Sequence, residues 1–232
     1  MDHIRENIIQ LNEKIRRILP KDVACENEVL LVAVTKTRSS AEINLAIDAG
    51  ITDIGENKVQ EILDKYEKVK SVHWHMIGHL QTNKVKYIID KVKMIHSVDT
   101  FKLAEEINKR ADQAGLTMDV LVQINAAKEE SKFGISAEES ENLIYEILKN
   151  CPCIRIKGLM SIAPFENNPE EVRRYFKQVR LLYDRFSKIS DKNLDFEYLS
   201  MGMSNDYEVA ISEGSNLIRI GTAIFGDRNY QL

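Results

Sequence analysis

Short apolar segments alternate with helical segments along the whole chain, and this alternation constrains the fold more than any other feature. The apolar segments lie near residues 29–35, 51–54, 73–77, 94–98, 118–125, 154–160, 196–199 and 217–220. They have the length of β-strands, and most stretches between them carry helical periodicity or capping residues. Eight strands separated by helices, without a linker, predict a single α/β domain over residues 1–232, a (β/α)8 TIM barrel. An open doubly wound sheet is the alternative, because periodicity alone does not exclude it.

An extra helix is predicted before the first strand, over residues 1–20, and is expected to pack on the barrel. Its apolar residues recur at steps of three and four, with Pro20 just beyond them: Ile4, Ile8, Leu11, Ile15 and Ile18. Later helix starts are indicated by capping-box spacing in residues 39–42 and 136–139, and by Asn168 followed by Pro169.

The composition is that of a globular protein and argues against several classes of function. Lys and Arg total 32 against 36 Asp and Glu, so the net charge of −4 offers no basic surface for nucleic acid or an anionic membrane. The longest apolar run is too short to cross a bilayer, and the polar N-terminus does not resemble a signal peptide. Cys25, Cys151 and Cys153 lack metal or redox spacing, so we expect reduced thiols in a cytoplasmic protein. No heptad seam predicts assembly, which leaves a monomer as the default.

Lys36 lies where the first predicted strand ends. The apolar run Val29–Val34 precedes it, with Thr35 between. An ammonium group at the end of a buried strand is partly desolvated, which favours the nucleophilic amine. This is the environment in which lysines form Schiff bases with carbonyl compounds. Taken alone, however, Lys36 is better interpreted as a lysine whose side chain extends to solvent from a strand end.

The loops after the seventh and eighth predicted strands have the features of a phosphate site, which barrels of this kind often build there. Gly202 and Gly221 permit close approach of the backbone to an anion, while Ser204 and Thr222 offer hydroxyl groups. Taken alone, Ser204 is equally well interpreted as the N-cap of the helix that follows.

Two further polar features fall inside predicted strands. Arg219 interrupts the apolar segment 217–220, and alternation places it on the strand face of Leu217. It must find acceptors, and an ion pair with an interior carboxylate is the structural alternative to a functional role. His73 and His75 share one face of the third strand, but no third zinc ligand is evident. His75 is therefore expected to be a hydrogen-bonded core histidine.

Taken in order, six segments resemble those of the pyridoxal phosphate homeostasis protein family. They are VTKT (34–37), GENKVQE (55–61), HMIGHLQTNK (75–84), GLMSIAP (158–164), LSMGMSND (199–206) and RIGTAIFG (219–226). The resemblance runs from about Leu30 to Tyr230 and implies a barrel like the N-terminal domain of alanine racemase, the type III pyridoxal phosphate fold. It also implies that pyridoxal 5'-phosphate (PLP) is bound as an imine to Lys36. The further contacts that it implies are the phosphate with Ser204, Gly221 and Thr222, Ser200 close by, the pyridine nitrogen facing Arg219, and Asn57 beside the cofactor.

The function implied by this resemblance is PLP homeostasis, in which the protein holds PLP and supplies client enzymes that depend on it. A cation opposite the pyridine nitrogen disfavours its protonation and so weakens the electron sink that PLP enzymes use. Racemases of this fold take a second base from an additional β domain, for which the residues after Gly221 are expected to leave no room. The alternative is a racemase-like enzyme in which His79 or Tyr207 provides that base. A Schiff-base aldolase acting on a phosphorylated sugar is a third hypothesis.

Overall fold

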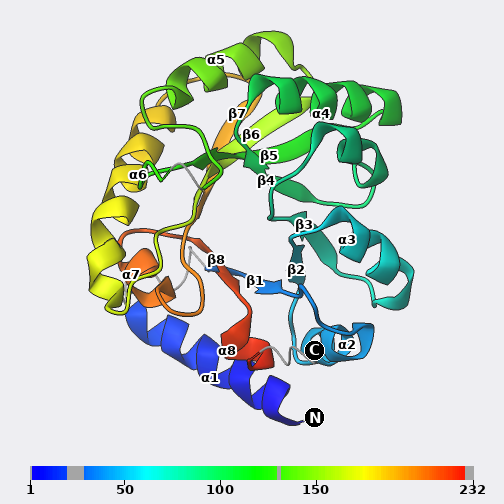
Figure 1. Cartoon of the computed structure of the whole chain (residues 1–232), viewed down its shortest axis with the longest axis vertical. Coiled ribbons are helices and arrows are strands. Elements are labelled where there is room, and N and C mark those ends of the chain that lie inside the picture. Colours follow the sequence, from blue (N-terminus) through cyan, green and yellow to red (C-terminus); the bar gives the residue numbers. More distant parts are fainter. Residues whose placement is uncertain (1, 20–28, 130–131, 228–232) are drawn as a thin grey trace.

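Eight parallel strands close into a barrel in the computed structural model, which describes residues 2–19, 29–129 and 132–227 (Figure 1). The strands are β1 (Leu30–Val34), β2 (Asp53–Glu56), β3 (His73–Met76), β4 (Met94–Val98), β5 (Met118–Ile124), β6 (Ile154–Ser161), β7 (Leu194–Ser200) and β8 (Leu217–Ile220). Each strand pairs with the next, and β8 pairs with β1 through a register that includes Val32 opposite Arg219. The predicted barrel is therefore confirmed, and the open sheet is wrong.

Helices surround the barrel in the order expected from the alternation (Figure 1). They are α1 (Asp2–Ile18), α2 (Ser40–Asp48), α3 (Val59–Lys65), α4 (Phe101–Ala114), α5 (Ser140–Asn150), α6 (Arg173–Phe186), α7 (Tyr207–Ser212) and α8 (Thr222–Phe225), with short 3-10 helices η1 (Tyr66–Lys68), η2 (Thr82–Tyr87) and η3 (Pro169–Val172). The predicted capping box is present at the start of α2, where Ser39 and Glu42 cap each other's backbone. Between β3 and β4 the described helical segment is the 3-10 helix η2.

The predicted N-terminal helix is confirmed as α1, although residues 1 and 20 of the predicted range lie outside the described residues. Four of its predicted apolar positions are buried in the main core: Ile4, Ile8, Leu11 and Ile15. Figure 1 shows α1 beside α8, and the Asn7 amide of α1 donates a hydrogen bond to the Ile224 carbonyl at 2.9 Å. The helix thus covers the segment that follows the last strand.

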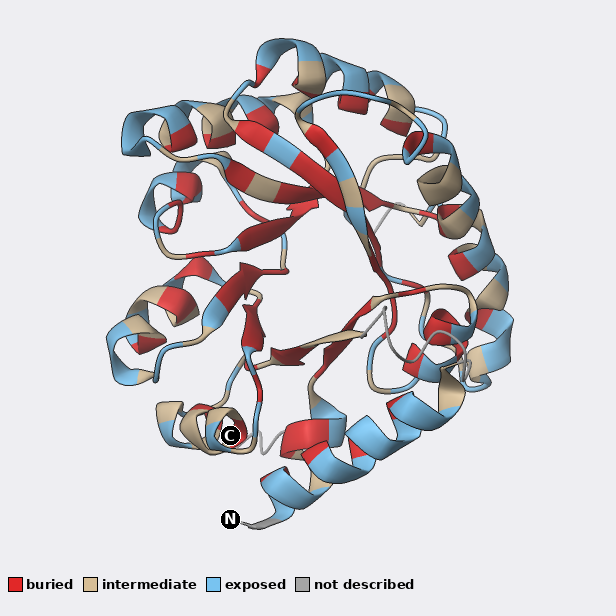
Figure 2. Cartoon of the chain, turned by 180° about the vertical axis from the view of Figure 1, so that it is seen from behind, coloured by how far each residue is buried: buried red, intermediate tan, exposed pale blue. Residues whose placement is uncertain are grey.

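The main core lies between the barrel wall and the helices, where Figure 2 shows buried residues on the facing sides of both. A separate small cluster inside the barrel consists of Met94, Leu121 and Met160, with Tyr198 against it. The interior also holds buried polar side chains, among them Asp53, His75, His96, Ser200 and Arg219. One part of the barrel interior is therefore apolar and another is polar.

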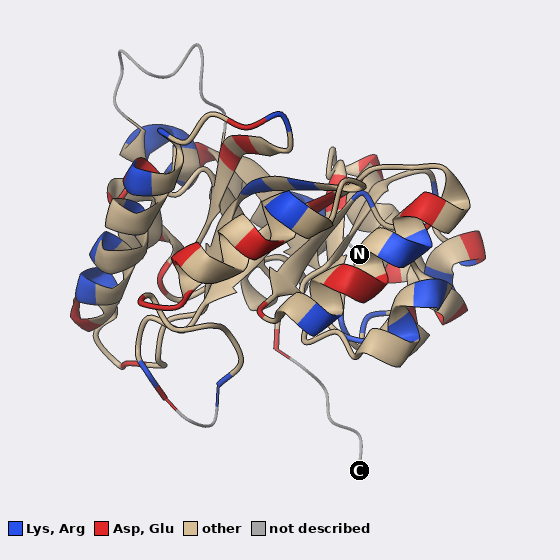
Figure 3. Cartoon of the chain, turned by 90° about the horizontal axis from the view of Figure 1, so that it is seen from above, with Lys and Arg blue, Asp and Glu red and all other residues tan. Residues whose placement is uncertain are grey.

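Basic and acidic side chains are interspersed on the outer helices, as Figure 3 shows. No helix in the described part of the chain is both long and apolar enough to cross a membrane. No cluster of three or more His, Cys, Asp or Glu suited to a metal ion occurs among the described residues. Cys151 and Cys153 are free thiols, and Cys25 lies outside the described residues.

Candidate functional site

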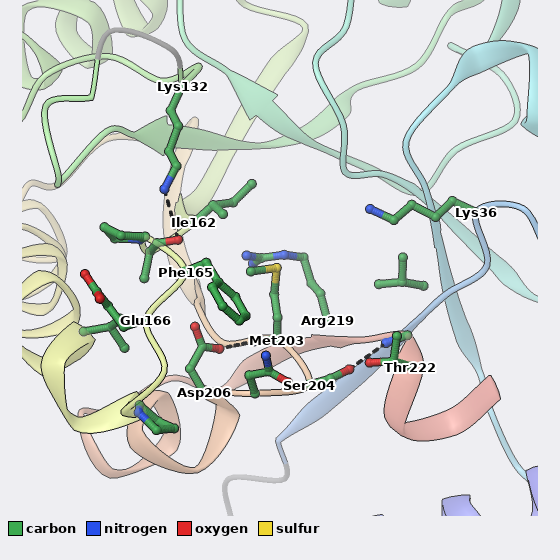
Figure 4. A pocket seen from close by; sticks show the side chains of 17 residues that line it. Lys36, Lys132, Ile162, Phe165, Glu166, Met203, Ser204, Asp206, Arg219 and Thr222 are labelled. Carbon is green, nitrogen blue, oxygen red and sulfur yellow. Dashed lines mark hydrogen bonds between the residues drawn. The ribbon is translucent and has the colours of Figure 1, made fainter. Parts of the chain in front are cut away.

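A cavity of about 390 Å³ lies at the end of the barrel where the strands finish (Figure 4). Its wall comes from the ends of β1 and β8 and from the segments that follow β1, β5, β6, β7 and β8, far apart in the sequence. They contribute Val34, Lys36, Lys132, Ile162, Ala163, Pro164, Phe165, Glu166, Pro169, Val172, Met203, Ser204, Asn205, Asp206, Arg219, Gly221 and Thr222. The carboxyl end of a barrel is where sites of this fold are built, because the loops after all the strands converge there.

Five of the predicted site residues line this cavity: Lys36, Ser204, Arg219, Gly221 and Thr222. Ser200 and Asn57 do not line it. Ser200 is fully buried beneath it, where its hydroxyl accepts a hydrogen bond from the Arg219 guanidinium. Asn57 lies just after β2, and its backbone packs so tightly on Gly78 that a Cβ there would be 2.4 Å from the Asn57 carbonyl oxygen.

Lys36 is partly buried, and its side chain extends into the cavity from the end of β1 (Figure 4). The turn that carries it is held on both sides. The Thr35 hydroxyl donates to Glu56 Oε1 at 2.7 Å, and the Thr37 amide donates to Glu61 Oε2 at 2.7 Å. Thr37 has a φ of 66°, a left-handed conformation that costs energy in a β-branched residue and so needs such support.

A lysine that the sequence analysis did not single out organises these supports. Lys65 Nζ donates to the Thr35 carbonyl at 3.0 Å, to Glu56 Oε1 at 2.8 Å and to Glu61 Oε2 at 2.7 Å. Burial raises the pKa of Glu56, although the hydrogen bond and charge of Lys65 oppose this. The three charged groups therefore form a partly buried network behind the Lys36 turn. Its only sequence signal is the four-residue spacing of Glu61 and Lys65 on α3.

The two turns predicted to bind phosphate are joined to each other. Ser204 Oγ accepts the amide hydrogens of Gly221 and Ala223, each at 3.3 Å. Gly202 has a φ of 92°, and a Cβ at this position would lie 2.7 Å from Ala210 Cβ, so the turn requires glycine. The N-cap position of α7 belongs to Asp206, so the interpretation of Ser204 as a helix cap is wrong. Its hydroxyl instead faces α8, which Thr222 begins.

Arg219 closes the inner end of the cavity and is only 4% exposed. Its Nη2 donates to the Ser161 carbonyl at 2.9 Å, and its Nη1 donates to Ser200. Burial lowers the pKa of Arg219 to about 10, although Asp206 opposes this. Its hydrogen-bond partners among the described residues are a hydroxyl and a backbone carbonyl, so the ion pair with an interior carboxylate, the structural alternative, is not found there. A guanidinium has five N–H donors, and the cavity side of this one suits an acceptor on a ligand.

The two residues suggested as a second catalytic base do not line the cavity. His79 is exposed and stacks on Phe133 with ring centroids 3.8 Å apart. Tyr207 is buried on α7, where its hydroxyl donates to Glu208 at 3.3 Å. Burial, together with the Glu208 charge, raises the pKa of Tyr207 to about 12.

The outer part of the cavity was not predicted. An apolar rim of Ile162, Pro164, Phe165 and Met203 lies there beside Lys132, whose amine donates to the Ala163 carbonyl at 3.3 Å. Lys132 belongs to the charged loop around residues 128–132 and brings that loop to the cavity. Residues 130–131 of this loop lie outside the described part of the chain.

Comparison with known proteins supports this architecture. The profile of the family described as alanine racemase, N-terminal domain, matches residues 2–229. A pyridoxal phosphate homeostasis protein of Aquifex aeolicus is 42% identical over 97% of this chain and 98% of its own length. The protein of the same name from Escherichia coli K12 is 36% identical over 99% of both chains.

Solved structures agree with these matches. PipY of Synechococcus elongatus, in a structure with PLP bound, has 31% identity and a TM-score of 0.82, over 96% of this chain and all of its own. A protein from Bifidobacterium adolescentis has 34% identity and a TM-score of 0.89, over 96% of this chain and 94% of its own. Alanine racemase from Clostridium difficile, at 17% identity and a TM-score of 0.75, shares the fold; the match covers this whole chain and 61% of the racemase. The chain therefore belongs to the pyridoxal phosphate homeostasis protein family and has the barrel of the alanine racemase N-terminal domain.

Proposed function

We propose that this protein binds PLP through Lys36 and acts in PLP homeostasis in the cytoplasm, holding the cofactor as a monomer and supplying it to enzymes that need it. The observation that carries this proposal is one cavity that brings together a lysine amine, paired backbone amides with hydroxyls, and a buried guanidinium. Relatives that match this chain over nearly its full length carry the name pyridoxal phosphate homeostasis protein, which supports the proposal.

The three chemical groups of PLP fit the three parts of this cavity. Lys36 is the amine for the aldehyde, and Gly221, Thr222 and Ser204 form the site for the phosphate, where the hydroxyls of Thr222 and Ser204 are the donors. Arg219 is the partner for the pyridine nitrogen, with Ser200 holding the guanidinium from below. PLP, when bound, supplies an aldehyde that an amine takes up and releases reversibly. Asn57 does not line the cavity. Its position beside the cofactor therefore stays a prediction from the family resemblance.

The lining of the cavity favours a carrier over an enzyme. Arg219 disfavours a proton on the pyridine nitrogen, because two adjacent cations repel each other. Neither histidine nor tyrosine occurs among the described residues that line the cavity. A protein that stores and releases PLP needs an amine, an anion site and access, and this cavity offers all of them.

The direct test is the colour of the purified protein and the site of reductive trapping. We expect a yellow protein in which borohydride fixes the cofactor on the peptide that contains Lys36, as mass spectrometry identifies it. Lys36→Ala should lose both signals. Lys132→Ala is the matched control, because Lys132 lines the same cavity, and it should keep both. A wild-type protein that takes up no added PLP, or trapping at Lys132, would refute the site.

A second measurement separates carrier from racemase. The PLP-loaded protein is incubated with several amino acids in deuterated water, and uptake of deuterium at the α-carbon is followed by NMR. We expect no exchange above that of free PLP. Rapid exchange that Lys36→Ala abolishes would instead establish the racemase-like alternative.

A further inference from the structure

A line of buried polar side chains crosses the barrel interior and ends at Arg219. His75 Nε2 lies 2.8 Å from Asp53 Oδ1, and His75 Nδ1 lies 2.8 Å from His96 Nε2. His96 Nδ1 lies 3.5 Å from Ser200 Oγ, which in turn accepts the hydrogen bond from Arg219. All five side chains belong to residues that are at most 4% exposed. Asp53, His75 and His96 do not line the cavity, so the site described above does not explain them.

The hydrogen bonds fix where each proton of this line resides. Burial alone would raise the pKa of Asp53, but the hydrogen bonds from His75 and Thr52 and the charge of Lys93 hold it well below its usual range. Ionised Asp53 only accepts, so His75 carries its hydrogen on Nε2 and accepts on Nδ1. His96 must then also carry its hydrogen on Nε2, which leaves its Nδ1 to accept from the Ser200 hydroxyl. Burial lowers the pKa of both histidines, in agreement with two neutral rings.

Every donor therefore points the same way, from the Arg219 cation to the Asp53 anion. A buried cation is costly without compensation, and the charge of Asp206 offsets the burial of Arg219 only in part, since the pKa of Arg219 is still lowered. Hydrogen bonds in one direction polarise one another, so the Asp53 anion stabilises the Arg219 cation in part through this line. At the far end, His73 Nδ1 and Lys93 Nζ lie 3.3 and 3.4 Å from Asp53 Oδ1. Asp53 and His73 begin their strands, so this end is opposite the cavity.

We propose that Asp53, His75 and His96 are positioning residues of the cofactor site, acting through Ser200 on Arg219. Together they keep the Ser200 oxygen turned toward the guanidinium and so hold the Arg219 side chain facing the cavity. The proposal rests on the proposed function in one respect, because the effect of the line on the site is measured as a change in affinity for PLP.

The first test needs no cofactor. Nitrogen-15 NMR of the protein without PLP reports which ring nitrogen of each histidine carries hydrogen. We expect the Nε2–H tautomer for both His75 and His96, assigned by loss of signals in His75→Gln and His96→Gln. Hydrogen on Nδ1 of either neutral ring would break the direction of the line and overturn the proposal.

The second test compares matched variants by their affinity for PLP. Asp53→Asn keeps an acceptor for His75 but removes the charge, and it should weaken binding about tenfold, the size of effect that loss of an outer partner has at metal sites. Asp119→Asn is its control, because Asp119 is also a strand aspartate with an ion pair, to Arg155 at 2.7 Å, but lies outside the line. It should leave the affinity unchanged. Equal affinities for Asp53→Asn and Asp119→Asn would overturn the proposal.

A second pair of variants keeps the proposal testable if the Asp53→Asn protein does not fold. His96→Gln retains a donor toward His75 and an acceptor toward Ser200, whereas His96→Leu has similar bulk and neither group. The glutamine variant should keep the wild-type affinity and absorption spectrum of bound PLP, and the leucine variant should lose affinity and shift the spectrum. If both bind alike, the line does not position Arg219. A wild-type protein that fails to bind PLP would instead refute the proposed function, while the tautomer measurement would still test the line.

Discussion

At the scale of single residues, the environment of Lys36 depends on side chains brought to it by other elements. Considered alone in the sequence, this lysine suits a solvent-exposed strand end, yet it is partly buried beside the cavity. Lys65 from α3 and Glu56 from β2 fix the backbone around it. Glu56 Oε2 is buried and has no hydrogen-bond partner among the described residues, so this carboxylate depends on the contacts of its other oxygen.

Loss of the Lys65 amine should therefore destabilise the protein strongly. Lys65→Met keeps the alkyl chain but leaves Glu56 without its cation, and breaking a buried pair in this way costs about 3–5 kcal/mol of unfolding free energy. Urea denaturation measures the change. The control is Lys70→Met, because Lys70 pairs with Asp48 at the surface, where such a change costs less than about 1 kcal/mol. Equal effects of the two variants would contradict the buried network.

At the scale of elements, β2 shows how buried polar residues displace a strand from the position that an apolar pattern predicts. Residues 94–98 form β4 as predicted. The second strand, predicted at 51–54, is Asp53–Glu56, since its two carboxylates are buried and partnered by His75 and Lys65. Such partners come from other elements, so a local apolar pattern cannot reveal them. For the same reason Ser204, Gly221 and Thr222 could be predicted from strand ends, whereas Lys65 could not.

The helix α1 provides a sharp test at this scale, because two adjacent isoleucines differ in burial. Ile8 is 1% exposed in the core, whereas Ile9 is 50% exposed. Ile8→Ala should lower the unfolding free energy by about 2–5 kcal/mol, through lost burial and the cavity that remains. Ile9→Ala, the same chemical change one residue later, should stay within about 0.5 kcal/mol of wild type. Urea denaturation of both variants decides whether α1 packs on the barrel, and equal losses would argue against it.

At the scale of the whole molecule, closure of the barrel brings together polar side chains whose contacts no single segment predicts. The sequence predicts eight strands and places Arg219 on an inner face, but the partners of that arginine come from β6 and β7. His96 lies within an apolar segment and Asp53 near the start of a strand, and only closure joins them through His75. A polar barrel interior is therefore invisible to an analysis of local hydrophobic periodicity.

This interior also determines how stability depends on pH. His75 and His96 have lowered pKa values in the folded protein, so below about pH 6.5, the usual histidine value, the unfolded chain binds more protons than the folded one. Stability then rises with pH through this range and is lost as pH falls from about 6.5 toward the folded pKa values. Asp53 also has a lowered pKa, so its contribution is present above about pH 3.9 and is lost below it.

The unfolding free energy should therefore decline with falling pH well before Asp53 titrates. Each buried neutral histidine contributes a slope of up to about 1.4 kcal/mol per pH unit between about pH 6.5 and its lowered folded pKa. His96→Gln removes one of the two rings, so its slope in this range should be smaller than that of wild type by about that amount. Urea denaturation at several pH values between about 7.5 and 5 measures both slopes, with Ile9→Ala as a control that changes no titratable group. A His96→Gln slope equal to that of wild type and of Ile9→Ala would mean that His96 is not held neutral in the barrel.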